Sequence, residues 1–345
     1  MRFGGQEWER RAFEARLGRL EQVGGLRRFH LAEGREKGVE QIQVRTGAGL
    51  CYYVSPSRAL DISLAEFGGV PLSWQAPNGD VHPAYYDARE AEWLRTAVGG
   101  LLMTCGLTYV GAPGEDQGQA FGLHGRIHHL PARQVSAVGA WQGDNYEMTI
   151  SGMVEEAVIF GEHLHLTRTI RSTLGVNRID IEDQVENVGF SETPLMILYH
   201  FNFGFPLLSE QTRLRFPSQK VVVRDEGTPL EGYDRWQAPA PGYQERVYYH
   251  QEFEADEVSA VVHNPAFPLP GGDRPLTVRL SWFTSQLPRL VQWKMPGAGT
   301  HVLGIEPANC YVEGRAVERA RGTLEMLAPG QKKEMHLTLE VETDG

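Results

Sequence analysis

The sequence has few cysteines and no long apolar run. Its 345 residues include Cys51, Cys105 and Cys310, which are widely separated and form no CxxC pair. Neither a disulfide framework nor a structural zinc site is therefore indicated. No segment approaches the ~18 consecutive apolar residues of a membrane-spanning helix. The charged segment 1–11 also lacks the apolar stretch of a signal peptide, and we expect a cytoplasmic protein.

Positive charge and several catalytic motifs are also scarce. Lys and Arg number 33 against 44 Asp and Glu, which gives a formal net charge of −11. This balance supplies no basic surface of the kind that phosphate backbones require, so nucleic acid and anionic membranes are poor partners. The motifs of serine hydrolases, P-loop proteins, zinc peptidases and dinucleotide-binding proteins are absent.

Turn-forming residues and alternating apolar residues are abundant instead. The 39 Gly and 20 Pro are spread along the whole chain, which indicates many short elements. Segments rich in Val, Ile, Tyr and Thr with a period of two lie between them. The predicted strands are 42–45, 50–54, 146–151, 163–171, 178–188, 195–203, 220–224, 246–253, 258–263, 276–283, 290–293 and 334–341.

This succession of strands predicts an all-β fold. Strands without intervening helical patterns favour antiparallel sheets packed face to face over a parallel βαβ sheet. About 16 to 20 strands would fit at the usual spacing, which favours one large sandwich. A short amphipathic helix is expected within 8–20, in an N-terminal helical or extended segment 1–38, and the sandwich domain spans 39–345. Residues 228–243 form the longest strand-poor stretch of the second half.

Three segments carry chemically informative residues. In the first, His124 is followed by Gly125 and Arg126, and the glycine allows the backbone to approach a ligand closely. In the second, alternation along strand 195–203 places His200 and Asn202 on one face. Two polar groups on an apolar strand need hydrogen-bond partners or a cavity, because burying them unpaired costs ~1–3 kcal/mol each.

The third segment is an apolar strand that ends in Glu306, directly before Pro307. A carboxylate on a rigid strand end that opens into a loop is well placed to act as an acid or a base. Each of the three segments alone is also compatible with a purely structural role.

A fourth segment, His163-Leu164-His165, puts two imidazoles on one strand face. In a cupin metal site a Glu would follow four residues later, but Thr169 stands there and no second His motif follows. We therefore expect solvent-facing histidines and no metal site.

The three segments, in this order, resemble those of the aldose 1-epimerase (galactose mutarotase) superfamily. Its members carry a His-Gly loop, a second His in a strand that begins with Thr-Pro, and a Glu-Pro segment near the C-terminus; the matching residues are His124-Gly125, Thr193-Pro194 with His200, and Glu306-Pro307. From about residue 40 to 342 the chain further resembles an uncharacterised, aldose 1-epimerase-like branch of this superfamily.

The resemblance implies a large antiparallel β-supersandwich that binds a sugar. Glu306 would be the general base on the anomeric hydroxyl, His200 the general acid on the ring oxygen, and His124 a substrate hydrogen-bond partner. This chemistry needs no metal and no redox cofactor. Further substrate-binding candidates are Arg58, Arg95, Arg126, Asn202, Asp234, Trp293 and Asn309.

Some of these candidates bear on the identity of the sugar. Arg126 directly after His124-Gly125 occurs in some phosphosugar-acting members, so a phosphorylated or acidic sugar is one possibility. Asp234 is the candidate for the carboxylate that holds a sugar hydroxyl in this superfamily. Trp74, Trp93, Trp236 and Trp293 could form an apolar platform under a pyranose ring, and Trp293 is favoured because it lies on a strand shortly before Glu306.

The sequence predicts a carbohydrate mutarotase or epimerase and leaves two alternatives open. One is a different carbohydrate-active enzyme, such as a lyase, an isomerase or a glycosidase; a glycosidase would need a second carboxylate across the pocket from Glu306. The other is a noncatalytic carbohydrate-binding protein. A monomer and a homodimer joined at a sheet edge are both compatible with the sequence.

Overall fold

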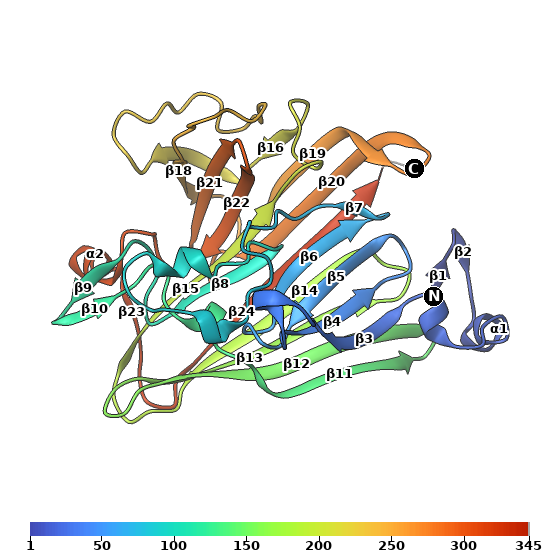
Figure 1. Ribbon diagram of the computed structural model, residues 1–345, viewed down its shortest axis with the longest axis horizontal. Helices are drawn as coiled ribbons and strands as arrows, with labels where there is room; N and C mark the ends of the chain where they lie inside the picture. Colours follow the sequence, from blue (N-terminus) through green and yellow to red (C-terminus); the bar gives the residue numbers. More distant parts are fainter. Residues whose placement is uncertain (344–345) are drawn as a thin grey trace.

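Two large antiparallel sheets form the body of the protein (Figure 1). The structure is a computed structural model that describes residues 1–343. The smaller sheet has eight strands. In spatial order they are β11 (Arg133–Gln142), β12 (Asn145–Ala157), β13 (His163–Thr173), β14 (Arg178–Asn187), β24 (Lys332–Thr343), β20 (Gly272–Phe283), β19 (Glu257–Leu269) and β16 (Arg213–Arg215).

The larger sheet has twelve strands and carries most of the residues discussed below. Its main path runs β17 (Ser218–Val223), β18 (Arg246–Phe253), β21 (Arg289–Gly297), β22 (Thr300–Ala308), β15 (Thr193–Phe203), β8 (Leu102–Leu107), β6 (Asp61–Phe67), β5 (Leu50–Ser55), β4 (Glu40–Arg45) and β3 (Gly25–His30). Two short strands lie off this path: β23 (Glu325–Leu327) pairs with β15, and β7 (Val70–Pro71) pairs with β6.

The burial pattern of the strands explains how the sheets pack. Along β13, Leu164 and Leu166 are buried between the sheets, whereas His163 and His165 face outward. This is the alternation of a sheet with one covered face. Strand β15 differs because both of its faces are covered. Tyr199, Phe201 and Phe203 belong to the core, and His200 lies on the opposite face.

The predicted fold is confirmed. All twelve strand segments expected from the sequence coincide with strands of the structure, and the architecture is the large antiparallel β-sandwich that the resemblance implied. Residues 228–243 contain no strand, and this segment packs on β21, where the Lys294 ammonium donates to the carbonyl groups of Gly232 and Arg235.

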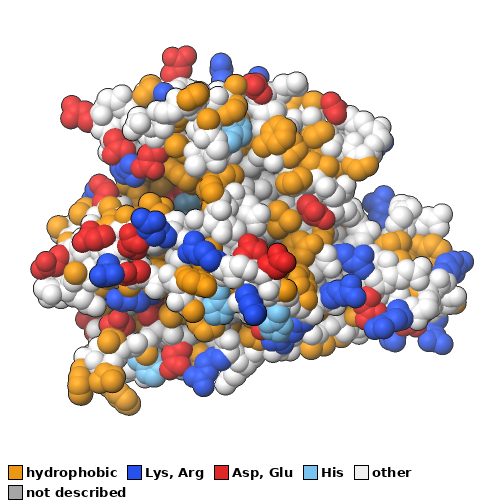
Figure 2. Space-filling model, in the orientation of Figure 1, with side chains coloured by type: hydrophobic (Ala, Val, Ile, Leu, Met, Phe, Trp, Pro, Cys, Tyr) orange, Lys and Arg blue, Asp and Glu red, His pale blue; other side chains and the backbone are white. Residues whose placement is uncertain are grey.

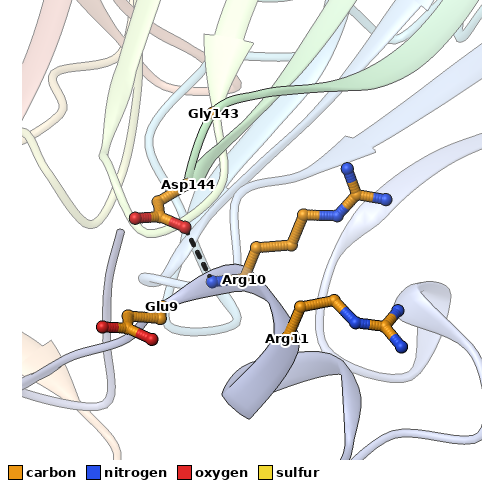
Figure 3. Close-up of a pocket in the computed structure, with 5 residues that line it drawn as sticks. All are labelled: Glu9, Arg10, Arg11, Gly143 and Asp144. Carbon is orange, nitrogen blue, oxygen red and sulfur yellow. Dashed lines mark hydrogen bonds between the residues drawn. The ribbon is translucent and has the colours of Figure 1, made fainter.

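The N-terminal helix is shorter than the range 8–20. It comprises α1 (Arg10–Glu14), and a 3-10 turn η1 (Leu20–Gln22) follows. Glu9 at the helix start makes no side-chain cap; instead Asp144, from the turn between β11 and β12, accepts the N–H of Arg10 at 2.9 Å (Figure 3). Strand β3 pairs with β4, so the larger sheet already includes residues 25–30 of the segment 1–38.

The remaining elements are short and connect or flank the sheets. They are β1 (Arg2–Phe3), β2 (Gln6–Glu7), β9 (Gly114–Asp116), β10 (Gln119–Phe121), α2 (Arg315–Arg321), and the 3-10 turns η2 (Gly34–Glu36), η3 (Pro83–Tyr85), η4 (Glu92–Arg95) and η5 (Ile127–His129). Within residues 1–343, every helix is too short or too polar to span a bilayer.

A buried polar network joins the two sheets. The Arg168 guanidinium on β13 donates to both carboxylate oxygens of Asp183 on β14 and to Asp61 on β6. Asp61 also accepts from the Thr104 backbone N–H, and the Tyr199 hydroxyl donates to Asp183 at 2.7 Å. Buried charges are tolerated only when paired and hydrogen-bonded, and here both carboxylates and the guanidinium have such partners.

Candidate functional site

A cavity of about 970 Å³ opens beside β21, β22 and β15. In Figure 2 a recess separates the upper part of the molecule, which carries β18 and β21, from the middle part. The apolar lining of the cavity includes Trp74, Trp93, Leu123, Val247, Val291 and Trp293. Its polar lining includes His124, His200, Arg224, Asp225, Glu245, Glu306 and Glu313. A mostly apolar hollow with a few converging polar groups is typical of a small-molecule site.

His200 and Glu306 form a buried pair in this cavity. They come from the neighbouring strands β15 and β22, and Phe201 pairs with Ile305 between these strands. The His200 Nε2 and Glu306 Oε1 atoms lie 3.2 Å apart, and the two side chains are 8% and 3% exposed. Among the described residues, neither His200 Nδ1 nor Glu306 Oε1 has a hydrogen-bond partner of good geometry.

Burial shifts both groups toward their neutral forms. It raises the pKa of Glu306 well above its ordinary value, and the nearby charge of Glu245 adds to this increase. Burial also lowers the pKa of His200 to about 3. Low-dielectric surroundings disfavour the charged form of any group, so burial favours a protonated Glu306 carboxyl beside a neutral His200 imidazole.

Gly304 makes room for this pair. A Cβ atom at this position would lie 2.4 Å from Glu306 Oε1, 3.0 Å from Trp293 Cβ and 3.2 Å from His200 Cε1. Any larger residue would displace the carboxylate or the imidazole, because real Cβ atoms do not approach other atoms below about 3 Å.

His124 reaches the cavity from the loop between β10 and η5. Its backbone has a positive φ of 56°, and the next residue, Gly125, is also left-handed at 74°. A Cβ at Gly125 would lie 2.4 Å from two carbonyl oxygens, so only glycine fits this turn. The His124 ring packs edge-on against His200 at 6.1 Å, and burial lowers the pKa of His124 to about 4.

Trp293, Glu245 and Arg224 form a hydrogen-bonded chain along one side of the cavity. Trp293 Nε1 donates to Glu245 Oε2 at 2.9 Å, and Arg224 donates to Glu245 Oε1 at 2.8 Å. The Trp293 ring also packs edge-on against Trp74 at 6.4 Å. These contacts hold an indole surface and an oriented carboxylate at the same site.

The three arginines predicted to bind substrate do not line the cavity. Arg58 is buried, and its guanidinium donates to the carbonyl oxygen of Val81. The Arg95 side chain is 74% exposed and pairs with Glu92. Arg126 is anchored through its backbone N–H to the Gly106 carbonyl, beside the cavity loop.

Three further predicted binders also lie off the cavity. Asn202 is fully buried and donates to the backbone carbonyl of His200. Asn309 bridges strands by accepting from the Ile197 N–H and donating to the Leu195 carbonyl. Asp234 lies in the loop 228–243, where its backbone carbonyl accepts from Leu214.

Sequence reasoning missed three lining carboxylates, Asp225, Glu245 and Glu313, of which Glu245 contacts Trp293. Glu245 directly precedes β18. Glu306, by contrast, does not end its strand as expected from the sequence, because β22 continues past it to Ala308. Of the four candidate tryptophans, Trp74, Trp93 and Trp293 line the cavity, whereas Trp236 is buried and donates to His301 Nε2 at 2.7 Å.

The arrangement suits the transfer of protons between two oxygen atoms of a bound ligand. A neutral Glu–His pair can release one proton to one oxygen and accept another from a second oxygen nearby. Among the described residues, the three that meet at metal-ligand spacing are Glu155, His163 and His165, and these lie outside this cavity.

Comparisons with known proteins agree with the fold and with the sequence resemblance. Residues 36–341 match the family model of a domain of unknown function, DUF4432. No curated protein matches the chain. The family model is therefore consistent with the resemblance of the sequence to an uncharacterised branch of the superfamily.

Several solved structures are similar to this chain. A protein of Klebsiella pneumoniae, to which aldose 1-epimerase activity is provisionally assigned, is 26% identical over 92% of this chain and 83% of its own, with a TM-score of 0.80. A galactose mutarotase-like protein of Clostridium acetobutylicum is 12% identical over 94% and 100% of the two chains, with a TM-score of 0.65. The galactose 1-epimerase of Lactobacillus acidophilus is 12% identical over 93% and 99%, with a TM-score of 0.58. The last two likenesses show the fold alone.

Proposed function

The chain belongs to the DUF4432 family, a domain of unknown function, and we propose that it is a carbohydrate epimerase that interconverts the anomers of a monosaccharide. The observation that carries this proposal is the buried pair of Glu306 and His200, 3.2 Å apart in an aromatic-lined cavity. The similarity to the Klebsiella protein, to which aldose 1-epimerase activity is provisionally assigned, supports the same reaction.

In the proposed reaction, the Glu306 carboxylate takes the proton of the anomeric hydroxyl while His200 protonates the ring oxygen. The bond between C1 and the ring oxygen breaks, and the sugar opens to its free aldehyde. Rotation about C1–C2 presents the other face of the carbonyl group, and the reverse transfers close the ring as the other anomer.

This scheme places a proton on His200 before the ring opens. Burial favours the protonated carboxyl of Glu306, so the scheme requires that this proton pass to His200 when the sugar binds. The 3.2 Å separation between His200 Nε2 and Glu306 Oε1 is short enough for this transfer.

The remaining lining residues hold the sugar. Trp293 and Trp74 offer apolar surface to a pyranose ring, and His124 is within reach of the same space as His200. Glu245, in place of Asp234, is the carboxylate that holds a sugar hydroxyl. Its carboxylate, oriented by Arg224 and Trp293, accepts a hydrogen bond from that hydroxyl.

The charge of the lining favours an uncharged sugar. Arg224 is the lining arginine, and two carboxylates, Asp225 and Glu245, already neutralise it. Arg126, the candidate for binding a phosphorylated or acidic sugar, lies off the cavity. A cytoplasmic location, and the choice between a monomer and a homodimer, stay predictions.

Glu245 also favours a second candidate, a glycoside-cleaving enzyme. Such an enzyme uses two carboxyl groups on either side of the scissile bond, one protonated and one ionised. Glu306, with its raised pKa, suits the acid, and Glu245 lines the same cavity. Against this candidate, both oxygens of Glu245 are engaged by Arg224 and Trp293.

The test is proton NMR of anomeric exchange over a panel of neutral aldoses, acidic sugars, sugar phosphates and aryl glycosides. We expect faster exchange with a neutral aldose and a loss of ~100- to 10,000-fold in Glu306→Gln and His200→Ala, the range of general acid–base catalysis. Glu182→Gln, on the exposed face of β14, is the matched control and retains the wild-type rate.

Other outcomes would replace the proposal. Release of the aglycone from an aryl glycoside would establish the glycosidase. Sugar binding without any turnover, in the wild type and in Glu306→Gln alike, would make the protein a noncatalytic carbohydrate-binding protein. Full exchange activity in folded Glu306→Gln would remove this residue from the mechanism.

A further inference from the structure

Two histidines on the outer face of the eight-stranded sheet meet a glutamate from the adjacent strand. His163 and His165 are two residues apart on β13, so both side chains point to the same face. Glu155 on β12 pairs directly with His165, and Ala157 pairs with His163. The sequence showed the two imidazoles; the register of the hairpin β12–β13 supplies the carboxylate.

The three side chains converge at the spacing of metal ligands. Glu155 Oε1 lies 2.8 Å from His163 Nε2 and 3.8 Å from His165 Nε2, and one ligand atom from each residue lies within 4.8 Å of the others. Two imidazole nitrogens and one carboxylate oxygen are a common ligand set for zinc, which leaves a fourth position for water.

We propose that Glu155, His163 and His165 form a binding site for a divalent transition metal ion such as Zn²⁺, separate from the sugar cavity. The side chains are 30%, 41% and 27% exposed, so an ion reaches them from solvent without any opening of the fold. The imidazole and carboxylate ligands favour Zn²⁺, Ni²⁺ or Cu²⁺ over Mg²⁺ and Ca²⁺, which prefer oxygen ligands.

Charged neighbours orient the Glu155 carboxylate and influence the affinity of the site for a cation. Arg133 donates to Glu155 Oε2 at 2.7 Å, which orients the carboxylate and leaves Oε1 toward the two histidines. Its positive charge also opposes a cation. On the other side of His165, Glu186 is the paired residue on β14, and it forms an ion pair with Lys332 at 3.3 Å. The proposed ligand set is therefore limited to three residues.

A bound ion would clip the hairpin β12–β13 near its turn, which lies at the lower left in Figure 1. Because an ion that binds only the folded state stabilises it, Zn²⁺ in excess should raise the melting temperature by about 2–4 °C. The sugar reaction does not require the ion, so epimerase activity is expected to be the same with and without Zn²⁺.

The test is isothermal titration calorimetry of the full chain, without an affinity tag, against Zn²⁺, Ni²⁺ and Mg²⁺ separately. We expect one Zn²⁺ per chain, no heat with Mg²⁺, and affinity reduced about 10- to 100-fold or more in His163→Ala and His165→Ala. His30→Ala, an exposed histidine on β3, is the matched control and keeps wild-type affinity.

Arg133→Gln separates a metal site from a surface ion-pair cluster. This change removes a stabilising partner of Glu155 but leaves the three ligands, so Zn²⁺ should bind as tightly as in the wild type or more tightly. The proposal is overturned if the wild type binds no Zn²⁺, or if the double variant His163→Ala/His165→Ala binds it unchanged. Neither result bears on the sugar reaction, which the NMR experiment tests independently.

Discussion

Two buried polar clusters of this protein are built on opposite principles. In the network between the sheets, Arg168 pairs with Asp61 and Asp183, and hydroxyl and backbone groups complete their hydrogen bonds. In the cavity, His200 and Glu306 are also buried, but His200 Nδ1 and Glu306 Oε1 have no partner of good geometry among the described residues.

The difference distinguishes groups that stabilise the fold from groups available for chemistry. A buried charge whose hydrogen bonds are complete has no capacity left for a ligand. A buried pair that lacks hydrogen-bond partners lowers the stability of the fold, and a bound sugar would supply those hydrogen bonds. Arg58, which was predicted to bind substrate, lies off the cavity and donates to the Val81 carbonyl, although its Nη1 atom has no partner among the described residues.

The largest effect is expected from removing Arg168. Arg168→Met leaves Asp61 and Asp183 buried without their shared cation, which should lower the free energy of unfolding by about 3–5 kcal/mol. Urea denaturation measures this change. Arg171→Met, on the exposed face of the same strand, is the control and should change stability by no more than ~0.5 kcal/mol. Equal effects of the two variants would contradict the structural role given to the network.

A smaller effect is expected from filling the space beside the cavity pair. Gly304→Ala forces the new methyl group against Glu306, His200 and Trp293, and overpacking of this kind costs ~1–3 kcal/mol of stability. Anomeric exchange should fall at least ~10-fold, because even small misplacement of reacting groups is costly. Gly18→Ala, where a methyl group meets no atom within 4 Å, should leave both quantities unchanged. A fully active Gly304→Ala would show that the pair tolerates displacement.

The smallest effect is a gain in stability that depends on pH. The pKa of Glu306 is raised in the folded state, so the folded protein holds this proton more tightly than the unfolded chain and loses stability as pH rises above about 4.5. Glu306→Gln lacks this loss and should be more stable than the wild type by ~0.5–2 kcal/mol at pH 8, although inactive.

His200 has the opposite sign and provides the check at acid pH. Its pKa is lowered to about 3, so the unfolded chain binds more protons than the folded state between about pH 6.5 and 3. Stability from this group is therefore lost as pH falls through that window, and His200→Gln should reduce the loss. Urea midpoints at pH 4, 6 and 8 for both variants measure the loss of stability toward high pH and the loss toward low pH. A stability difference that does not vary with pH in either variant would contradict the assigned burial effects.

Much of the fold was predictable because its signals are local. Alternation along 163–171 and 195–203 marked strands that the structure confirms, and the sides of β15 were assigned correctly, with His200 opposite Phe201. The short helix expected within 8–20 is confirmed as α1, Arg10–Glu14.

The site was predictable only in part. His124, His200, Glu306 and Trp293 line one cavity, as the resemblance suggested, although their roles stay predictions. The arginines could not be assigned from sequence, because the sequence does not distinguish an arginine whose guanidinium binds a backbone carbonyl from one that faces a ligand. Glu245 escaped notice since its partners, Arg224 and Trp293, are distant along the chain.

The sequence by itself determined the strands, the antiparallel class and the faces on which the polar residues lie, because side-chain alternation is a property of each strand alone. Only the tertiary structure decided which polar groups are satisfied and which are not. It placed His200 beside Glu306, brought Glu155 next to His163 and His165, and buried Arg168 between two aspartates. The reason is that hydrogen bonds between strands depend on pairing and register, which bring together residues that no local pattern connects.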